Sequence, residues 1–127
     1  MTIKEALDFV NGYKESKYSD EQKIKWLNAC EADIYNNIIC QHEYNEDEEE
    51  IEFNGYDSDT DEDTEMIVFP PYDSLYTFYL MAQIALLQHE FGFFNNYIEQ
   101  YKAMRDEFYA RWHQDHLPKQ NGKIIYY

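Results

Sequence analysis

The segment 72–94 reads YDSLYTFYLMAQIALLQHEFGFF and combines a high aromatic content with near-heptad spacing of its apolar residues. That spacing is typical of a helix that buries one face, so we predict a helix over about 72–94. The inner face is expected to present Leu75, Phe78, Ala82, Leu86 and His89.

A second helix is predicted directly after this one. Asn95 and Asn96 interrupt the apolar pattern, and Asn96 followed three residues later by Glu99 indicates a new helix N-terminus. The pattern then continues to about His116, ahead of Pro118. Its inner face is expected to present Tyr101, Met104, Phe108 and Trp112.

Two further helices are predicted upstream. Thr2 with Glu5 forms a capping-box pattern that starts a helix of about ten residues ending at Gly12. Ser19 with Gln22 forms a second such pattern and starts a helix that runs to about His42. The apolar faces are Ile3, Leu7 and Val10 in the first helix and Ile24, Leu27, Ile34 and Ile38 in the second.

Negative charge is concentrated in the middle of the chain. Thirteen of its 26 acids lie between Glu43 and Glu65, and no Lys or Arg occurs between Trp26 and Tyr101. Such a block repels itself and stays solvated, so we predict a long acidic loop over 43–71 that projects from the helical body. The sequence also allows a small hairpin that pairs residues 51–53 with residues 66–69.

These patterns predict an all-α fold, a small bundle of about four helices with the acidic loop between the second and third. The length of 127 residues suits one domain, expected over 1–119, followed by an extended tail over 120–127. The chain lacks an apolar run long enough to cross a bilayer and a secretory signal pattern, so we expect a soluble protein that starts in the cytoplasm. Cys30 and Cys40 lie ten residues apart in one predicted helix and are expected to be free thiols.

Composition and motifs argue against several functions. A formal charge of −16 argues against autonomous binding to a phosphate backbone. The alternating Asp57, Asp59, Asp61 and Asp63 resemble a calcium loop, but Glu62 and Val68 occupy the positions that require Gly and Glu.

The remaining candidate sites are equally weak. His113 and His116, with Asp115 or Asp106 nearby, could ligate a metal, but histidines at a helix C-terminus more often interact with its dipole and last carbonyls. Nucleophile elbows and phosphate-binding glycine loops are absent from the sequence. We therefore expect no enzyme activity, no cofactor and no metal.

Tyrosines are unusually frequent, at 13 of 127 residues. Several follow the two C-terminal helices, and together they offer more aromatic surface than one stripe per helix can bury. They either wrap the core with their hydroxyls in water or form a subunit interface, since Tyr supplies large amphipathic contact area. The candidate interface residues are Tyr72, Tyr76, Tyr79, Tyr97, Tyr101 and Tyr109.

Several stretches of the chain occur together in a familiar order: the opening TIKEA from Thr2, YSDEQKIKWL from Tyr18, PYDSLY from Pro71, YLMAQI from Tyr79, the pair Asn95-Asn96 and HLPK from His116. On these stretches, which together span residues 2–119, the chain resembles the small head-tail connector proteins of tailed bacteriophages, also called adaptor or head-completion proteins. The acidic loop is denser than is usual for the family, and the tail after Lys119 extends beyond the part that resembles it.

The resemblance implies a helical subunit of a ring, typically twelve-fold, below the portal in the virion, assembled in the host cytoplasm. Such a ring extends the DNA channel and joins the capsid to a tail-side stopper or completion protein; DNA passes without sequence-specific binding. The acidic loop is then expected to face the channel through Glu46, Asp47, Glu48, Glu49, Glu50, Asp57, Asp59, Asp61, Glu62 and Asp63. The tail is expected to dock on the portal or a neighbour through Lys119, Ile124, Ile125, Tyr126 and Tyr127.

Two other functions share parts of this pattern. An acidic DNA mimic that inhibits a nucleic-acid enzyme shares the net charge, but it requires carboxylates spaced over a rigid body. The third possible function is that of a small helical regulator with a disordered acidic arm.

Overall fold

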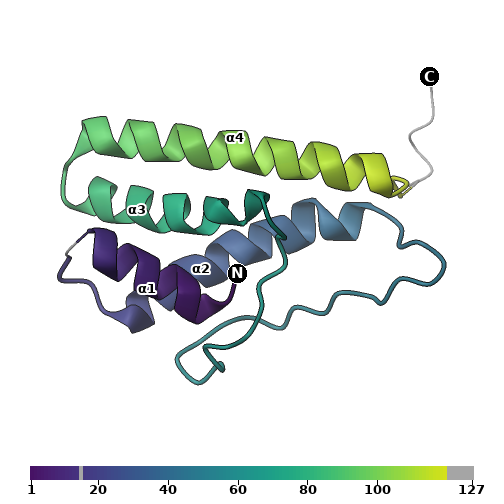
Figure 1. Cartoon of the computed structure of the whole chain (residues 1–127), viewed down its shortest axis with the longest axis horizontal. Coiled ribbons are helices and arrows are strands. Elements are labelled where there is room, and N and C mark those ends of the chain that lie inside the picture. Colours follow the sequence, from purple (N-terminus) through teal and green to yellow (C-terminus); the bar gives the residue numbers. More distant parts are fainter. Residues whose placement is uncertain (15, 120–127) are drawn as a thin grey trace.

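The computed structural model describes residues 1–14 and 16–119 (Figure 1). Within them the chain is helical, with four α-helices, two short 3₁₀ helices and no strand. This confirms the all-α class and the number of helices predicted. The elements are α1 (Ile3–Tyr13), α2 (Asp20–Asn37), η1 (Ile39–Gln41), η2 (Tyr72–Ser74), α3 (Leu75–Leu87) and α4 (Phe91–Asp115).

Helix α3 lies in the centre of the bundle (Figure 1). Helix α4 packs along one side of it, and α1 and α2 pack against the other. Consequently α3 is buried nearly all round, and Tyr76, Leu80, Met81 and Ile84 are in the core. A helix covered on several sides needs no single apolar stripe, which is why the predicted inner face of this helix was only partly correct.

The first two helices begin where the capping patterns place them. The Thr2 hydroxyl accepts a bond from the Glu5 N–H at 3.1 Å, and the Glu5 carboxylate accepts one from the Thr2 N–H at 2.9 Å. Ser19 caps α2 through the Gln22 N–H at 3.2 Å. Gly12 does not end α1, which includes it and continues to Tyr13.

The predicted boundary between the last two helices was wrong. Helix α3 ends at Leu87 and α4 begins at Phe91, so residues 88–90 form the turn. Asn95 and Asn96 lie inside α4. His89 adopts a positive φ of 59°, and the Glu90 N–H donates to the Ala85 carbonyl at 2.8 Å. His89 therefore occupies the left-handed position that ends many helices, a role that Asn or Gly usually fills, and its side chain is exposed, not on an inner face.

The second helix is also shorter than predicted. It ends at Asn37, and Cys40 lies in η1, so the two cysteines are not in one helix; both are free thiols.

Helices α2 and α4 are joined by Arg105, whose guanidinium donates to the Asp33 carboxylate at 2.8 and 3.3 Å. This two-point contact links α4 to α2.

Residues 42–71 contain no helix or strand and run along the underside of the bundle in Figure 1. The proposed hairpin between residues 51–53 and 66–69 is not formed. Glu65 instead pairs with Thr2 as an isolated β-bridge, and the Met66 N–H donates to the Met1 carbonyl at 3.0 Å. Residues 65 and 66 therefore form hydrogen-bonded contacts with the N-terminus of the chain and not with residues 51–53.

Candidate assembly surfaces

The segment 42–71, hereafter the acidic segment, is anchored to the bundle by a buried carboxylate. Glu31 of α2 has no exposed surface. Its oxygens accept bonds from the Tyr76 hydroxyl at 2.5 Å, the Tyr56 hydroxyl at 2.7 Å and the Ile67 N–H at 2.8 Å. The Tyr76 oxygen in turn accepts the Val68 N–H at 2.9 Å. One side chain therefore connects α2, α3 and two points of the acidic segment.

Burial dominates the acidity of this group. Loss of solvation raises the pKa of the Glu31 carboxyl above its ordinary value, although the three donors act in the opposite direction. Burial and the neighbouring carboxylate also raise the pKa of the Tyr76 and Tyr56 hydroxyls. The tyrosines therefore remain neutral donors, and the network needs no partner from outside the chain.

A second anchor joins the acidic segment to the start of α1. The Ile3 and Lys4 N–H groups donate to the Thr64 and Glu62 carbonyls at 3.1 and 2.9 Å. The first turn of a helix leaves such amides without helical partners, and the segment supplies them. The part of the segment that carries Asp57 to Asp63 is therefore held beside the N-terminus of α1.

A third anchor lies at the opposite end, where α4 finishes. The His116 ring donates through Nδ1 to the Trp112 carbonyl at 3.0 Å, and its Nε2 lies 2.9 Å from both Glu48 oxygens. Each ring nitrogen therefore faces an oxygen that can only accept, one from the backbone and one from a carboxylate. Partial burial acts to raise the pKa of Glu48, but the bonds from His116 and the Asn45 N–H outweigh it, and the pKa is lowered.

We expect Glu48→Gln to lower the free energy of unfolding by about 1 kcal/mol at neutral pH, since it removes a charge-assisted contact that is partly exposed. Because the folded pKa lies below the unfolded one, the contribution of Glu48 is present above the unfolded pKa and is lost as pH falls through the folded pKa. Urea unfolding across acidic pH should therefore show a smaller acid-side loss in the variant. Glu49→Gln, at the exposed neighbour, is the control; equal behaviour of the two variants would contradict the anchor.

Between these anchors the carboxylates point to solvent. Of the ten residues predicted to face a channel, nine are exposed and Glu48 is half-buried in its contact with His116. The apolar residues of the same segment face inward instead: Phe53 packs on Tyr35 of α2 and on Tyr56, with ring centroids 5.8 and 5.0 Å apart. The segment is therefore a fixed acidic edge of the described fold.

The six candidate interface tyrosines separate into two groups. Tyr76 is fully buried and Tyr101 is 7% exposed, so both belong to the core and cannot supply an interface. Tyr72 and Tyr79 are half-buried, against Phe108 and Tyr101 respectively. Tyr97 is also half-buried, and Tyr109 is 41% exposed. Burial of one side chain depends on which helices surround it, and this is why tyrosine spacing alone could not separate core from surface.

The end of α1, the end of α3 and the start of α4 lie at the left of Figure 1, and these segments carry several exposed apolar side chains. This apolar end consists of Phe9, Tyr13, Leu86, Leu87, Phe91 and Phe93, which are between 38% and 65% exposed. Sequence reasoning did not select these residues. Phe9 and Tyr13 could have been found, since they lie four residues apart on a face of α1 beside the one that carries Ile3, Leu7 and Val10. Exposed patches of this kind mark interaction sites.

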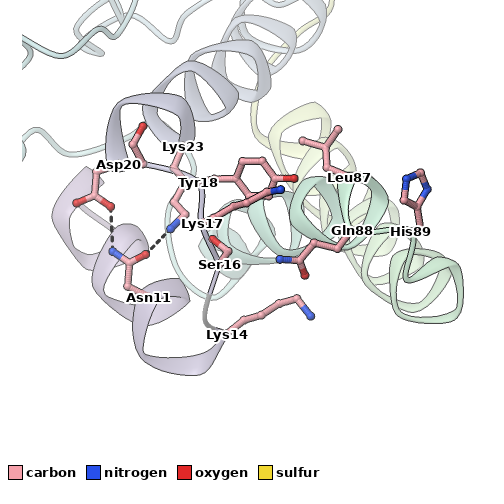
Figure 2. Close-up of a pocket in the computed structure, with 11 residues that line it drawn as sticks. Asn11, Lys14, Ser16, Lys17, Tyr18, Asp20, Lys23, Leu87, Gln88 and His89 are labelled. Carbon is pink, nitrogen blue, oxygen red and sulfur yellow. Dashed lines mark hydrogen bonds between the residues drawn. The ribbon is translucent and has the colours of Figure 1, made fainter.

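A hollow of about 1110 Å³ lies beside the apolar end, between the α1–α2 connection and the C-terminal end of α3 (Figure 2). Three lysines line it. Lys23 is buried and donates to the side-chain oxygen Oδ1 of Asn11, and the side-chain Nδ2 of Asn11 donates to Asp20 at 3.0 Å. Lys14 pairs with Glu90 at 2.8 Å. With two of its three ammonium groups engaged by the chain itself, the hollow has little free positive charge for an anion.

The histidines are used structurally. His42 is buried, donates through Nδ1 to the Ile38 carbonyl at 2.7 Å, and has Nε2 3.0 Å from Nδ1 of His113. His113 and His116 therefore face different partners, and in residues 1–14 and 16–119 no group of three potential ligands could hold a metal ion.

Burial raises the pKa of the Cys30 thiol well above its ordinary value, which makes it a poor nucleophile.

Two further observations bear on function. Among the described helices, none combines the length and hydropathy that a bilayer span requires. The predicted docking residues Ile124, Ile125, Tyr126 and Tyr127 lie outside the described residues, whereas Lys119 is exposed and its N–H donates to the Gln41 carbonyl at 2.9 Å.

Comparison with known proteins identified no relative: no family model, no curated protein and no solved structure matched the chain significantly.

Proposed function

We propose that this chain is the subunit of an oligomeric ring that lies below the portal of a tailed bacteriophage, extends the DNA channel and joins capsid to tail. The observation that carries the proposal is the acidic segment, whose carboxylates point to solvent while Glu31, the start of α1 and His116 hold its backbone. A fixed row of negative charge repels DNA phosphates, so a duplex can slide past without adhering. The proposal assigns the chain no catalytic activity and no cofactor.

The distribution of surfaces fits a ring. A ring of more than two subunits needs two different contact patches on each subunit, because its interface joins unlike faces. The apolar end lies where α4 begins, and the anchor between Glu48 and His116 lies where α4 finishes. The two ends of the molecule thus differ in chemistry, as a head-to-tail contact requires.

The direct experiment is electron microscopy of the purified chain mixed with the portal protein encoded in the same genome. We expect a ring of density added below the portal, with the acidic segment toward the bore. A portal that remains bare under all mixing ratios would contradict the proposal.

Neutralising the acidic segment tests the channel role. The variant Asp57→Asn, Asp59→Asn, Asp61→Asn and Glu62→Gln keeps the side-chain oxygens that Asp57 and Asp61 use to accept the Asp59 and Asp63 N–H groups at 2.9 Å. In phage particles that carry this variant we expect several-fold slower DNA ejection, because phosphates are no longer repelled.

The matched control removes the same four charges from exposed positions outside the segment: Glu21→Gln, Glu99→Gln, Asp106→Asn and Glu107→Gln. It should eject DNA at the normal rate. Equal rates for both variants and the unchanged protein would remove the channel-lining role.

One observation favours a second candidate, an acidic mimic of DNA that inhibits a nucleic-acid enzyme. A mimic requires carboxylates at fixed positions, and the three anchors hold the acidic segment on the bundle. Light scattering after size-exclusion chromatography separates the two functions. A ring subunit oligomerises alone or with the portal, whereas a mimic stays a monomer or dimer and binds a basic enzyme.

A further inference from the structure

An apolar groove of about 250 Å³ opens between α1, α3 and the first turns of α4. Phe9 and Tyr13 form one wall, stacked on each other with ring centroids 6.0 Å apart and planes 8° apart. Phe78 and Met81 of α3 and Tyr97 of α4 supply the other large apolar side chains, and Met1, Ser74 and Thr77 complete the lining. Phe9 is 52% exposed and Tyr13 65% exposed, so the described residues leave this wall open to solvent.

The chain contains one segment whose composition suits this groove. Residues 124–127 read IIYY, four consecutive apolar or aromatic residues, and residues 117–127 carry two lysines and no acid. The rest of the chain is strongly acidic, since the full sequence carries a formal charge of −16. Apolar burial therefore favours contact between the tail and the groove, and the opposite net charges favour contact between the tail and the remainder of another copy.

The tail cannot make this contact within its own subunit. The Lys119 N–H is bonded to the Gln41 carbonyl, at the end of the molecule where α4 finishes. Tyr97 and Asp115 are separated along α4 by about 27 Å at the rise of a helix. Five residues from Lys119 to Ile124 span at most about 18 Å when fully extended. Ile124 therefore falls short of that distance, and only Tyr127, at most about 29 Å from Lys119 when the tail is fully extended, approaches it. All four residues together fit a groove only on another copy.

We propose that residues 124–127 of one copy occupy the groove formed by Phe9, Tyr13, Phe78, Met81 and Tyr97 on the next copy. The contact joins unlike surfaces, so repetition of it closes a ring or extends a filament. A single four-residue contact is weak, but each copy in a ring both gives and receives a tail, and simultaneous engagement raises the overall affinity. The inference rests on the ring-forming part of the proposed function and names the second copy of this chain as the partner.

Peptide binding tests the contact directly. A fluorescent peptide of residues 117–127 is titrated into the chain truncated after Lys119, with fluorescence anisotropy as the measurement. We expect saturable binding that weakens at least tenfold in the double variant Phe9→Ser, Tyr13→Ser, and equally with a peptide that carries Ile124→Ser and Ile125→Ser. Leu87→Ser, which removes an apolar residue with 48% exposure outside the groove, is the matched control and should bind as the parent does.

Circular dichroism confirms that each variant is folded. No saturable binding, or binding that the groove variant does not weaken, would overturn the inference. The full-length chain at nanomolar concentration should bind the peptide as the truncated chain does; if it does not, its own tail fills the groove and the assignment to a neighbour is wrong.

A mixing experiment shows whether the contact joins copies. The truncated chain keeps its groove but has no tail, and the full-length Phe9→Ser, Tyr13→Ser variant keeps its tail but has an altered groove. Each alone should be a monomer, and an equal mixture should give a dimer by light scattering. A mixture that stays monomeric at concentrations where the parent associates would overturn the inference. If both truncated and groove variants still form rings on a portal, the inference fails while the proposed function stands.

Discussion

Replacing Glu31 by alanine is expected to lower the free energy of unfolding by about 3 to 5 kcal/mol, the largest effect of any single polar substitution that we predict. The change removes the acceptor of the Tyr76 hydroxyl, the Tyr56 hydroxyl and the Ile67 N–H, and it also leaves a cavity where a fully buried side chain was. Buried donors without partners lose their solvation with no compensation. Urea unfolding followed by circular dichroism measures the change.

The same substitution should release part of the acidic segment. Because Glu31 contacts the segment at Tyr56 and Ile67, limited proteolysis should cut between these residues faster in the variant under native conditions. Glu31→Gln is the matched control, since it keeps the shape and one acceptor oxygen, and it should cost clearly less. A loss below about 0.5 kcal/mol in the alanine variant, as at an ordinary surface position, would mean that the network does not anchor the segment.

The pH dependence of Glu31 runs opposite to that of Glu48. Its folded pKa lies above the unfolded value, so the folded state binds the proton more tightly. Its contribution to stability is therefore greatest below the unfolded pKa and declines as pH rises through the folded pKa. Glu31→Gln removes this titration. The difference in unfolding free energy between parent and Glu31→Gln should thus change over that range and be constant outside it.

Truncation of Phe108 to alanine is the second large effect that we expect, again about 3 to 5 kcal/mol. Phe108 is fully buried on α4, and its ring contacts Phe69, Tyr72 and Trp112 with centroids 5.4, 6.3 and 5.9 Å away. It therefore joins the end of the acidic segment and η2 to α4. Removing the ring forfeits these contacts and leaves a cavity that well-packed neighbours fill only in part.

Two further variants calibrate this result. Phe108→Leu keeps most of the volume and should cost about 1.5 kcal/mol or less if the neighbours repack. Glu107→Ala changes the exposed neighbour on the same helix and should leave the unfolding free energy within about 0.5 kcal/mol of the parent. Thermal and urea unfolding of all three variants give the comparison. An alanine variant as stable as the Glu107 control would show that the α4 contact with the acidic segment contributes little.

The sequence predicted the helices best where the signal is local. The Thr2 capping box, the Ser19 cap and the inner faces of the first two helices are all present, because they depend on contacts three or four residues apart. The end of the last helix at Asp115 is also close to its predicted position. The long negative block likewise contains no helix.

The α3–α4 boundary shows where this approach fails. Asn95 and Asn96 have the chemistry of a helix start, yet α4 continues through them, and His89 takes the positive φ that turns the chain. The packing of α4 against α3 determines the position of the turn, because it favours a chain reversal directly after Leu87. Intrinsic helix propensities differ by only a few tenths of a kcal/mol per residue, so the burial of two long helices against each other outweighs them.

The candidate surfaces divide in the same way. Charge content alone established that the middle of the chain is acidic and solvated, since like charges cannot be packed together. Only the folded structure decided that Glu31 is a buried anchor, that Glu48 is held by His116, and that Phe9 and Tyr13 stay exposed while Tyr76 does not. Each of these depends on residues far apart in sequence, and local periodicity has no information about which distant helix will cover a given face.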